Sequence, residues 1–274
     1  MSSAFIVGAG YVGLRAAELL AAKGIEVRVG RRTPPPGVPG HAMDVLRPES
    51  FPDAMRAAQA VVYCVAADAS TEEAYRAAYV TGLRNVLAHL EGGAARRFVF
   101  VSSTGVYGQS DGSIVDERTD PAPTGFTGRI LLEGEALVRA AAVPGTTIRF
   151  SGIYGPGRQR IVEEVRAGSP VSRARWEAYT NRIHREDCAR SLVHLLGRPG
   201  VAPLYVGTDA APVKLSEVME WIAARLGVAP PPVVELAPGE RRMRGGSKRC
   251  SGALLLSEGF MLEFPSYREG YALA

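Results

Sequence analysis

The chain has 274 residues, of which 46% are hydrophobic and 22% are charged, as is ordinary for one large domain or one domain with a smaller lobe. The net charge is only +4, and no broad basic stripe with interleaved aromatic residues occurs, which argues against nucleic acid as a partner. Three distant cysteines and four scattered histidines predict neither disulfides nor a metal site, and no apolar stretch is long enough to span a membrane. Without a basic leader segment, the chain is expected in the reducing cytoplasm.

The first thirty residues predict a strand, a glycine turn, a helix and a second strand. Residues 4–7 are apolar and precede the turn, residues 14–23 have a helical pattern that ends at Gly24, and residues 25–29 alternate as a strand. A weak third strand is expected to end near Asp44.

The alternation of strands and helices continues to about residue 150. Strands are expected at 60–65, 97–102 and 146–150, and helices at 71–90, with Thr71 as its cap, and at 129–142. Such alternation predicts an α/β fold with a doubly wound parallel sheet, the NAD(P)-binding Rossmann fold.

Regular alternation breaks down after Gly152. A helix is expected at 186–196, a short strand at 204–206, and a helix at 216–226 with Ser216 as its cap. We therefore expect a dinucleotide-binding domain over 1–153, its sheet completed by parts of 183–206, and a smaller lobe made mostly of 154–274.

The glycine turn between the first strand and helix has a spacing that is typical of dinucleotide binding. Gly8 permits the tight turn, Gly10 permits close approach of a pyrophosphate, and Gly13 permits close packing of helix on sheet. Tyr11 and Val12 of the turn are also expected to contact the cofactor, and the free N–H groups of the following helix favour an anion. The alternative is a glycine-rich turn without a ligand.

The end of the second strand indicates which dinucleotide binds. An NAD site usually has a carboxylate there for the ribose 2′-hydroxyl, whereas this strand ends in Arg31 and Arg32. Guanidinium groups suit a 2′-phosphate, so the sequence favours NADP over NAD. The alternative is that the two arginines are simply solvated.

Several segments, in the right order, resemble the extended short-chain dehydrogenase/reductase superfamily, of the NAD-dependent epimerase/dehydratase type. The matching segments are the glycine turn 8–13, Val101 to Gly108, Ile148 to Gly157, Ile183 to Asp187, and parts of 248–270. The resemblance implies a Rossmann lobe and a C-terminal substrate lobe, with a phosphorylated sugar or nucleotide-sugar as the small-molecule substrate.

The resemblance also implies roles for single residues. Asp44 and Val45 would lie near the adenine, and Ala66 and Ala67 would line the cofactor after the fourth strand. Ser103 would be the active-site hydroxyl of the family; its alternative role is that of a strand-end hydroxyl bonded to backbone.

The chain departs from the family at the catalytic tyrosine and lysine. The corresponding helix start places Thr127 and Leu131 where the family has tyrosine and, four residues later, lysine. No lysine of the chain follows a tyrosine by four residues. Thr127 is too weak an acid to replace the tyrosine, and Arg129, which stays protonated, cannot act as a base. Arg129 is expected to pair with Glu133 or to contact a phosphate.

The remaining candidates for acid/base chemistry come from loops and the second lobe. Tyr107, for which packing is the alternative, Tyr154, and the carboxylates of Asp116 and Glu117 could move a proton. Substrate phosphates could be held by basic side chains that are otherwise solvated, namely Arg158 and the cluster Arg241, Arg242, Arg244, Lys248 and Arg249.

Two functions are compatible with these residues. One is an NADP-dependent epimerase, dehydratase or reductase with an altered acid/base relay, and the other is a non-catalytic NADP-binding sensor or regulatory module. The family often forms homodimers through the helices at 71–90 and 129–142, so a dimer or a monomer is expected.

Overall fold

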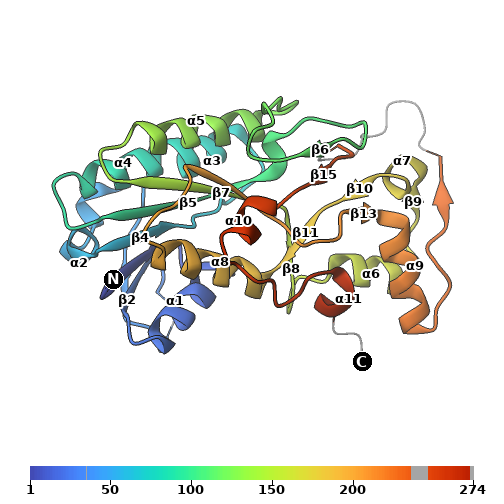
Figure 1. Ribbon diagram of the computed structural model, residues 1–274, viewed down its shortest axis with the longest axis horizontal. Coiled ribbons are helices and arrows are strands. Elements are labelled where there is room, and N and C mark those ends of the chain that lie inside the picture. Colours follow the sequence, from blue (N-terminus) through green and yellow to red (C-terminus); the bar gives the residue numbers. More distant parts are fainter. Residues whose placement is uncertain (35, 236–245, 272–274) are drawn as a thin grey trace.

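A computed structural model describes residues 1–34, 36–235 and 246–271. Its centre is a seven-stranded sheet in which every neighbouring pair runs parallel, in the order β12-β7-β5-β4-β1-β2-β3 (Figure 1). In this order the strands are Leu204–Gly207, Gly145–Phe150, Arg97–Ser103, Ala60–Tyr63, Ser3–Val7, Glu26–Arg31 and Gly40–Ala42. The predicted fold class is confirmed.

Helices cover both faces of this sheet (Figure 1). On one face lie α1 (Gly13–Ala22) and α8 (Arg185–Gly197), which pack on each other, and on the other lie α3 (Glu72–Arg76), α4 (Gly82–Leu90) and α5 (Phe126–Ala140). The inner strands β1 and β4 bury nearly every side chain because both of their faces are covered. Smaller helical segments of this part are η1 (Pro48–Ser50), α2 (Asp53–Ala57) and η3 (Thr104–Val106).

The chain order reverses at β1. Strands β2 and β3 extend the sheet to one side of β1, whereas β4, β5, β7 and β12 extend it to the other. The carboxyl ends of β1 and β4 therefore flank a switch point, where open α/β sheets hold their ligands.

Several helices differ from the sequence prediction, and α5, expected to begin at residue 129, begins at Phe126. The expected helix 71–90 begins after Thr71, whose hydroxyl accepts from the Ala74 N–H at 3.2 Å, but a π-helical turn, η2 (Ala77–Thr81), interrupts it. The prediction of Ser216 as a cap is wrong: α9 (Leu215–Leu226) begins one residue earlier, and the Lys214 N–H donates to the Glu217 carboxylate at 3.3 Å.

The rest of the chain forms short strand pairs and helices beside the sheet (Figure 1). The pairs are β8 (Gly152–Tyr154) with β11 (Arg182–His184), β10 (Tyr179–Thr180) with β13 (Val213–Lys214), β9 (Val171–Ser172) with β14 (Val233–Val234), and β6 (Ile114–Val115) with β15 (Arg249–Cys250). The helices are α6 (Arg160–Arg166), α7 (Arg173–Trp176), α9, α10 (Ala253–Ser257) and α11 (Tyr267–Gly270). Buried residues of α6 and α9 form a separate apolar core there.

The final segment returns to the sheet. Helix α10 packs on β12, and the buried Asp187 carboxylate accepts the backbone N–H groups of Glu263 and Phe264 at 2.8 and 2.9 Å. No helix in the described part of the chain has both the length and the hydrophobicity needed to cross a membrane.

Candidate functional site

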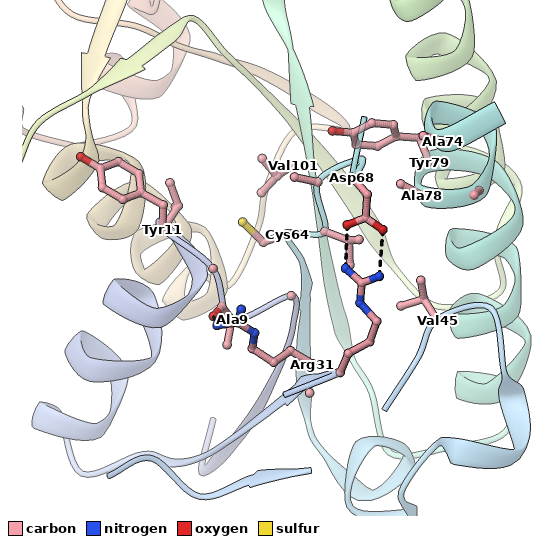
Figure 2. Close-up of a pocket in the computed structure, with 18 of the residues that line it drawn as sticks. Ala9, Tyr11, Arg31, Val45, Cys64, Asp68, Ala74, Ala78, Tyr79 and Val101 are labelled. Carbon is pink, nitrogen blue, oxygen red and sulfur yellow. Dashed lines mark hydrogen bonds and ion pairs between the residues drawn. The ribbon is translucent and has the colours of Figure 1, made fainter. Parts of the chain in front are cut away.

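A cavity of about 840 Å³ lies over the carboxyl ends of β1, β2, β4, β5 and β7 (Figure 2). The glycine turn forms part of its wall, and Ala74, Ala78 and Tyr79, from α3 and the π-helical turn, form another part. The volume is that of a typical small-molecule site. Of the residues predicted to bind a cofactor or substrate, those that line it are Gly8, Gly10, Tyr11, Val12, Arg31, Arg32, Asp44, Val45, Ala66, Ser103 and Arg158.

The three glycines of the turn meet three different requirements. Gly8 has φ +92°, and a Cβ there would lie 2.6 Å from the Cys64 carbonyl oxygen. A Cβ on Gly13 would lie 2.4 Å from the Gly8 carbonyl oxygen, so Gly13 brings α1 close to the turn. A Cβ on Gly10 would meet no atom within 4 Å. The cavity side of Gly10 is thus open to a phosphate, which α1 favours with the free N–H groups of its first turn.

Arg31, the last residue of β2, and Arg32, the next residue, contact different partners. The Arg31 guanidinium donates to the Ala9 carbonyl at 3.3 Å, under the glycine turn, and the Arg32 guanidinium forms two hydrogen bonds with the Asp68 carboxylate, at 2.8 and 2.6 Å (Figure 2). Arg32 holds the pKa of the Asp68 carboxyl below its usual range. Asp68 follows β4 and was not predicted from the sequence.

The residues expected near an adenine lie beside Arg32. The Asp44 carboxylate accepts the Leu46 N–H at 2.9 Å, and the Val45 carbonyl accepts from the Asn85 side chain at 2.9 Å, which fixes the loop after β3. Ala66 lines the cavity, whereas Ala67 lies outside the lining.

The opposite end of the cavity is lined by the end of β5. Ser103 lines it and its hydroxyl accepts the Gly105 N–H at 3.1 Å, so the strand-end bond expected as an alternative coexists with an exposed position in the site. Leu131, which the resemblance was expected to place at the family's lysine position, also lines the cavity. Thr127 and Arg129 lie outside the lining.

Arg129 does not make the expected ion pair. The Glu133 carboxylate is bound instead by Arg76 of α3, at 2.8 Å. Arg76 reaches Glu133 because α3 packs beside α5.

Tyr107 is buried beneath the site rather than exposed in it. Its hydroxyl donates to the Asp116 carbonyl at 2.6 Å and accepts from Arg149 at 2.8 Å, and burial raises its pKa to about 12. Arg149 in turn forms a buried ion pair with Glu135 at 2.6 Å, and Ser102, which lines the cavity, donates to Glu135 at 2.7 Å. This buried network therefore holds Ser102, one of the residues that line the cavity.

The other acid/base candidates also lie outside the cavity lining. The Tyr154 hydroxyl is within 3.3 Å of the Ser266 carbonyl, and burial raises its pKa. The Glu117 carboxylate accepts the Val206 N–H at 2.7 Å, and burial raises its pKa as well. The Asp116 carboxylate accepts the N–H groups of its own turn.

The basic candidates are divided between two places. Arg158 lines the cavity with its guanidinium 4.4 Å from the centre of the Tyr11 ring, and the Tyr11 hydroxyl donates to the Pro156 carbonyl at 2.8 Å. Lys248 is buried and donates to the Tyr107 carbonyl at 2.8 Å, and Arg249 donates to the Gly112 carbonyl at 2.8 Å. The remaining members of the cluster, Arg241, Arg242 and Arg244, lie outside the described residues.

The sequence reasoning missed several lining residues. Tyr79 projects from the π-helical turn, and burial raises its pKa to about 12 (Figure 2). Cys64, Asp68 and Ser151 follow β4 and β7. The carboxyl ends of parallel strands gather at one edge of the sheet. A position at or after the end of a predicted strand was therefore the signal that could have identified these three residues. For Tyr79 the sequence held no such signal.

A family model, described as the NAD-dependent epimerase/dehydratase family, matches residues 4–200. The chain belongs to this family. Among solved structures, a Methylobacillus flagellatus protein provisionally classed as an NAD-dependent epimerase/dehydratase is 38% identical, with a TM-score of 0.82 over 99% of this chain and 97% of that one.

More distant structures share the fold of this epimerase/dehydratase family member. The protein MoeE5, solved with UDP-glucuronic acid and NAD, is 23% identical, with a TM-score of 0.83 over 99% of this chain and 97% of that one. The UDP-glucose 4-epimerase of Thermus thermophilus, solved with NAD, is 21% identical, with a TM-score of 0.77 and the same two coverages. No curated protein matches the sequence significantly.

Proposed function

We propose that the protein binds NADP in this cavity and acts on a sugar or nucleotide-sugar as an epimerase, dehydratase or reductase with an altered acid/base relay. The observation that carries the proposal is the open face of Gly10 at the start of α1, within a cavity of suitable volume. The NAD and UDP-sugars present in the MoeE5 complexes support the ligand class.

The preference for NADP follows from charge at the end of β2. Arg31 and Arg32 both line the cavity, and neither β2 nor the turn after it places a carboxylate there. A 2′-phosphate carries about two negative charges and suits bidentate guanidinium donors.

Exchange of these arginines tests the preference. The double variant Arg31→Asp, Arg32→Ser should raise the Kd for NADP by at least about tenfold and change the Kd for NAD far less, measured by isothermal titration calorimetry. Arg28→Ser removes an exposed arginine of the same strand, which pairs with Glu26, and should change neither Kd. An unchanged ratio of the two Kd values in the double variant would contradict the NADP assignment.

The chemistry proposed for this site is limited by its polar groups. A bound nicotinamide supplies hydride exchange. Ser103 and Tyr79 line the cavity and carry hydroxyl groups, which are suited to donate hydrogen bonds to a substrate oxygen. Neither is an effective base near neutral pH, and Leu131 offers no charge that would lower a nearby pKa.

This limitation favours a second candidate function, a non-catalytic NADP-binding sensor or regulatory module. The carboxylates that line the described part of the cavity are Asp44 and Asp68, and both are already engaged, Asp44 by the Leu46 N–H and Asp68 by Arg32. A screen of nucleotide-sugars and sugar phosphates for NADPH turnover and for product isomerisation separates the two functions. Tight NADP binding without turnover of any of them supports the module.

The proposal also covers the cellular location and the oligomeric state of the protein. We propose that the protein acts in the cytoplasm, where its three widely spaced cysteines would stay reduced. We propose that α3, η2, α4 and α5, which make up the helices expected at 71–90 and 129–142, would form the interface of a homodimer, and light scattering of the purified chain distinguishes a dimer from a monomer.

A further inference from the structure

The ion pair between Arg32 and Asp68 joins two loops across the cavity. Arg32 follows β2, Asp68 follows β4, and β1 with its glycine turn lies between these strands. Both side chains line the cavity, and Figure 2 shows the Asp68 carboxylate facing the guanidinium from the opposite loop. The pair therefore lies beside the glycine turn, where the adenosine half of a dinucleotide would lie.

The Arg32–Asp68 ion pair has two short hydrogen bonds, but another anion can readily replace Asp68 as the partner of Arg32. Its side chains are 64% and 66% exposed, so water solvates both charges and the bond adds little to stability. Its two short bonds nevertheless occupy the fork of the Arg32 guanidinium, which is the face that a phosphate would also take. Asp68 and a phosphate are thus competitors for Arg32.

The two dinucleotides differ in this competition. A 2′-phosphate that takes the Nη1–Nη2 edge of the Arg32 guanidinium must displace Asp68 from it. A 2′-hydroxyl carries no charge, leaves the ion pair in place, and can donate a hydrogen bond to a carboxylate. Arg31, bound to a backbone carbonyl, remains available to a phosphate in either case.

We propose that Asp68 is a specificity-determining residue that lowers the preference for NADP by holding Arg32, and that Arg32 changes partner from Asp68 to the 2′-phosphate when NADP binds. The inference rests on the proposed function, since it requires dinucleotide binding in this cavity. NAD binds with the ion pair intact, so the pair penalises NADP alone.

The test is a double-mutant cycle on the full chain, with the Kd values of NADP and NAD measured by isothermal titration calorimetry at low salt. Asp68→Asn should tighten NADP binding by about twofold to fivefold, as expected for an exposed ion pair, and leave NAD unchanged or slightly weaker. In the Arg32→Gln background the same substitution should change NADP binding by less than about twofold. The gain should shrink in 0.5 M salt because exposed charges are screened.

A matched control removes the carboxylate of another exposed ion pair. Glu177 pairs with Lys214 at 2.9 Å, at a distance from the cavity lining, and Glu177→Gln changes the net charge by the same amount. Its ratio of Kd values should equal that of the parent protein, and thermal unfolding should show that every variant is folded.

The possible outcomes are distinct. An unchanged ratio in Asp68→Asn, or equal weakening of both dinucleotides, overturns the inference. An equal gain in the Arg32→Gln background also overturns it, since Asp68 would then act by repulsion and not through Arg32. Failure of the parent protein to bind either dinucleotide would instead refute the proposed function.

Discussion

Of the three glycines after β1, Gly10 and Gly13 have different surroundings, so an added Cβ atom would affect the protein differently at each. Gly10 faces open space, and its backbone has an ordinary φ, so a methyl group there would collide only with a ligand. Gly13 faces the Gly8 carbonyl at a distance that no real Cβ tolerates, so a methyl group there would collide with the protein itself.

Substitution of Gly10 should affect ligand binding, whereas substitution of Gly13 should affect folding stability. Gly10→Ala should weaken dinucleotide binding by at least about tenfold and change the free energy of unfolding by no more than about 0.5 kcal/mol. Gly13→Ala should lower the free energy of unfolding by about 1–3 kcal/mol, as overpacking against rigid backbone does. Urea unfolding and calorimetry of both variants measure the two effects, and a folded Gly10→Ala protein with full affinity would contradict the placement of the ligand.

The sequence allowed some site residues to be predicted and not others. Gly8 and Gly10 are found by spacing because local chain geometry defines their environment, whereas Ser103 is found through the family resemblance. Asp68 acquires its role only through Arg32, which is 36 residues away in sequence, and no local pattern contains that contact. Tyr79 faces the cavity because of a π-helical turn that hydrophobic periodicity does not predict.

Helix α5 contains two ion-paired glutamates in very different surroundings. Glu135 is 3% exposed and binds both Arg149 and Ser102, whereas Glu133 is 45% exposed and binds Arg76. Removal of one member of a buried pair leaves an uncompensated charge, which an exposed pair avoids through solvation.

The two glutamates therefore predict unequal effects of the same substitution. Glu135→Ala should lower the free energy of unfolding by about 3–5 kcal/mol, because it leaves the Arg149 charge buried and unpaired. Glu133→Ala, two residues away in the same helix, should change it by no more than about 1 kcal/mol. Denaturant unfolding compares them, and similar losses in both would disprove the importance of the buried network.

For whole helices, sequence periodicity predicts where a helix forms more reliably than it predicts which residues its side chains contact. The helix containing Glu133 is correctly expected, but its partner is Arg76 and not Arg129 because α3 packs alongside. Tyr107 lies in a matching family segment yet is held by Arg149, from a strand 42 residues later.

In the molecule as a whole, a buried carboxyl lies where the second lobe meets the sheet. Asp209 follows β12, its N–H donates to the Arg182 carbonyl at 2.7 Å, and its Oδ2 is buried with no hydrogen-bond partner among the described residues. Burial raises the pKa of this carboxyl to about 7, against a smaller opposing effect of Arg182.

This raised pKa makes stability depend on pH in a direction opposite to that of most carboxyls. Between about pH 4 and pH 7 the folded protein retains the proton of Asp209 while the unfolded chain has lost it, so the free energy of unfolding falls as pH rises and levels off above about 7. The difference between the parent protein and Asp209→Asn should shift by up to about 3 kcal/mol between pH 5 and pH 8. Urea unfolding at pH 5 and pH 8 measures it, and parallel profiles would contradict the burial argument.

The arrangement of the lobes was harder to predict than the sheet. The parallel sheet follows from alternating apolar strands, but the short pairs β6–β15 and β9–β14 join segments more than 60 residues apart through two residues each. Strands of two residues have no detectable periodicity, so this part of the fold depends on packing that emerges only in three dimensions.

The place of β12 at the sheet edge has a consequence for synthesis on the ribosome. The hydrogen-bonding edge of β7 is completed by Leu204–Gly207, about fifty residues after β7 itself has emerged. For several seconds of translation the nascent chain therefore presents an open strand edge, which is a template for wrong pairing. Stalled chains that end before β12 should be more protease-sensitive and more dependent on chaperones than chains that have passed it.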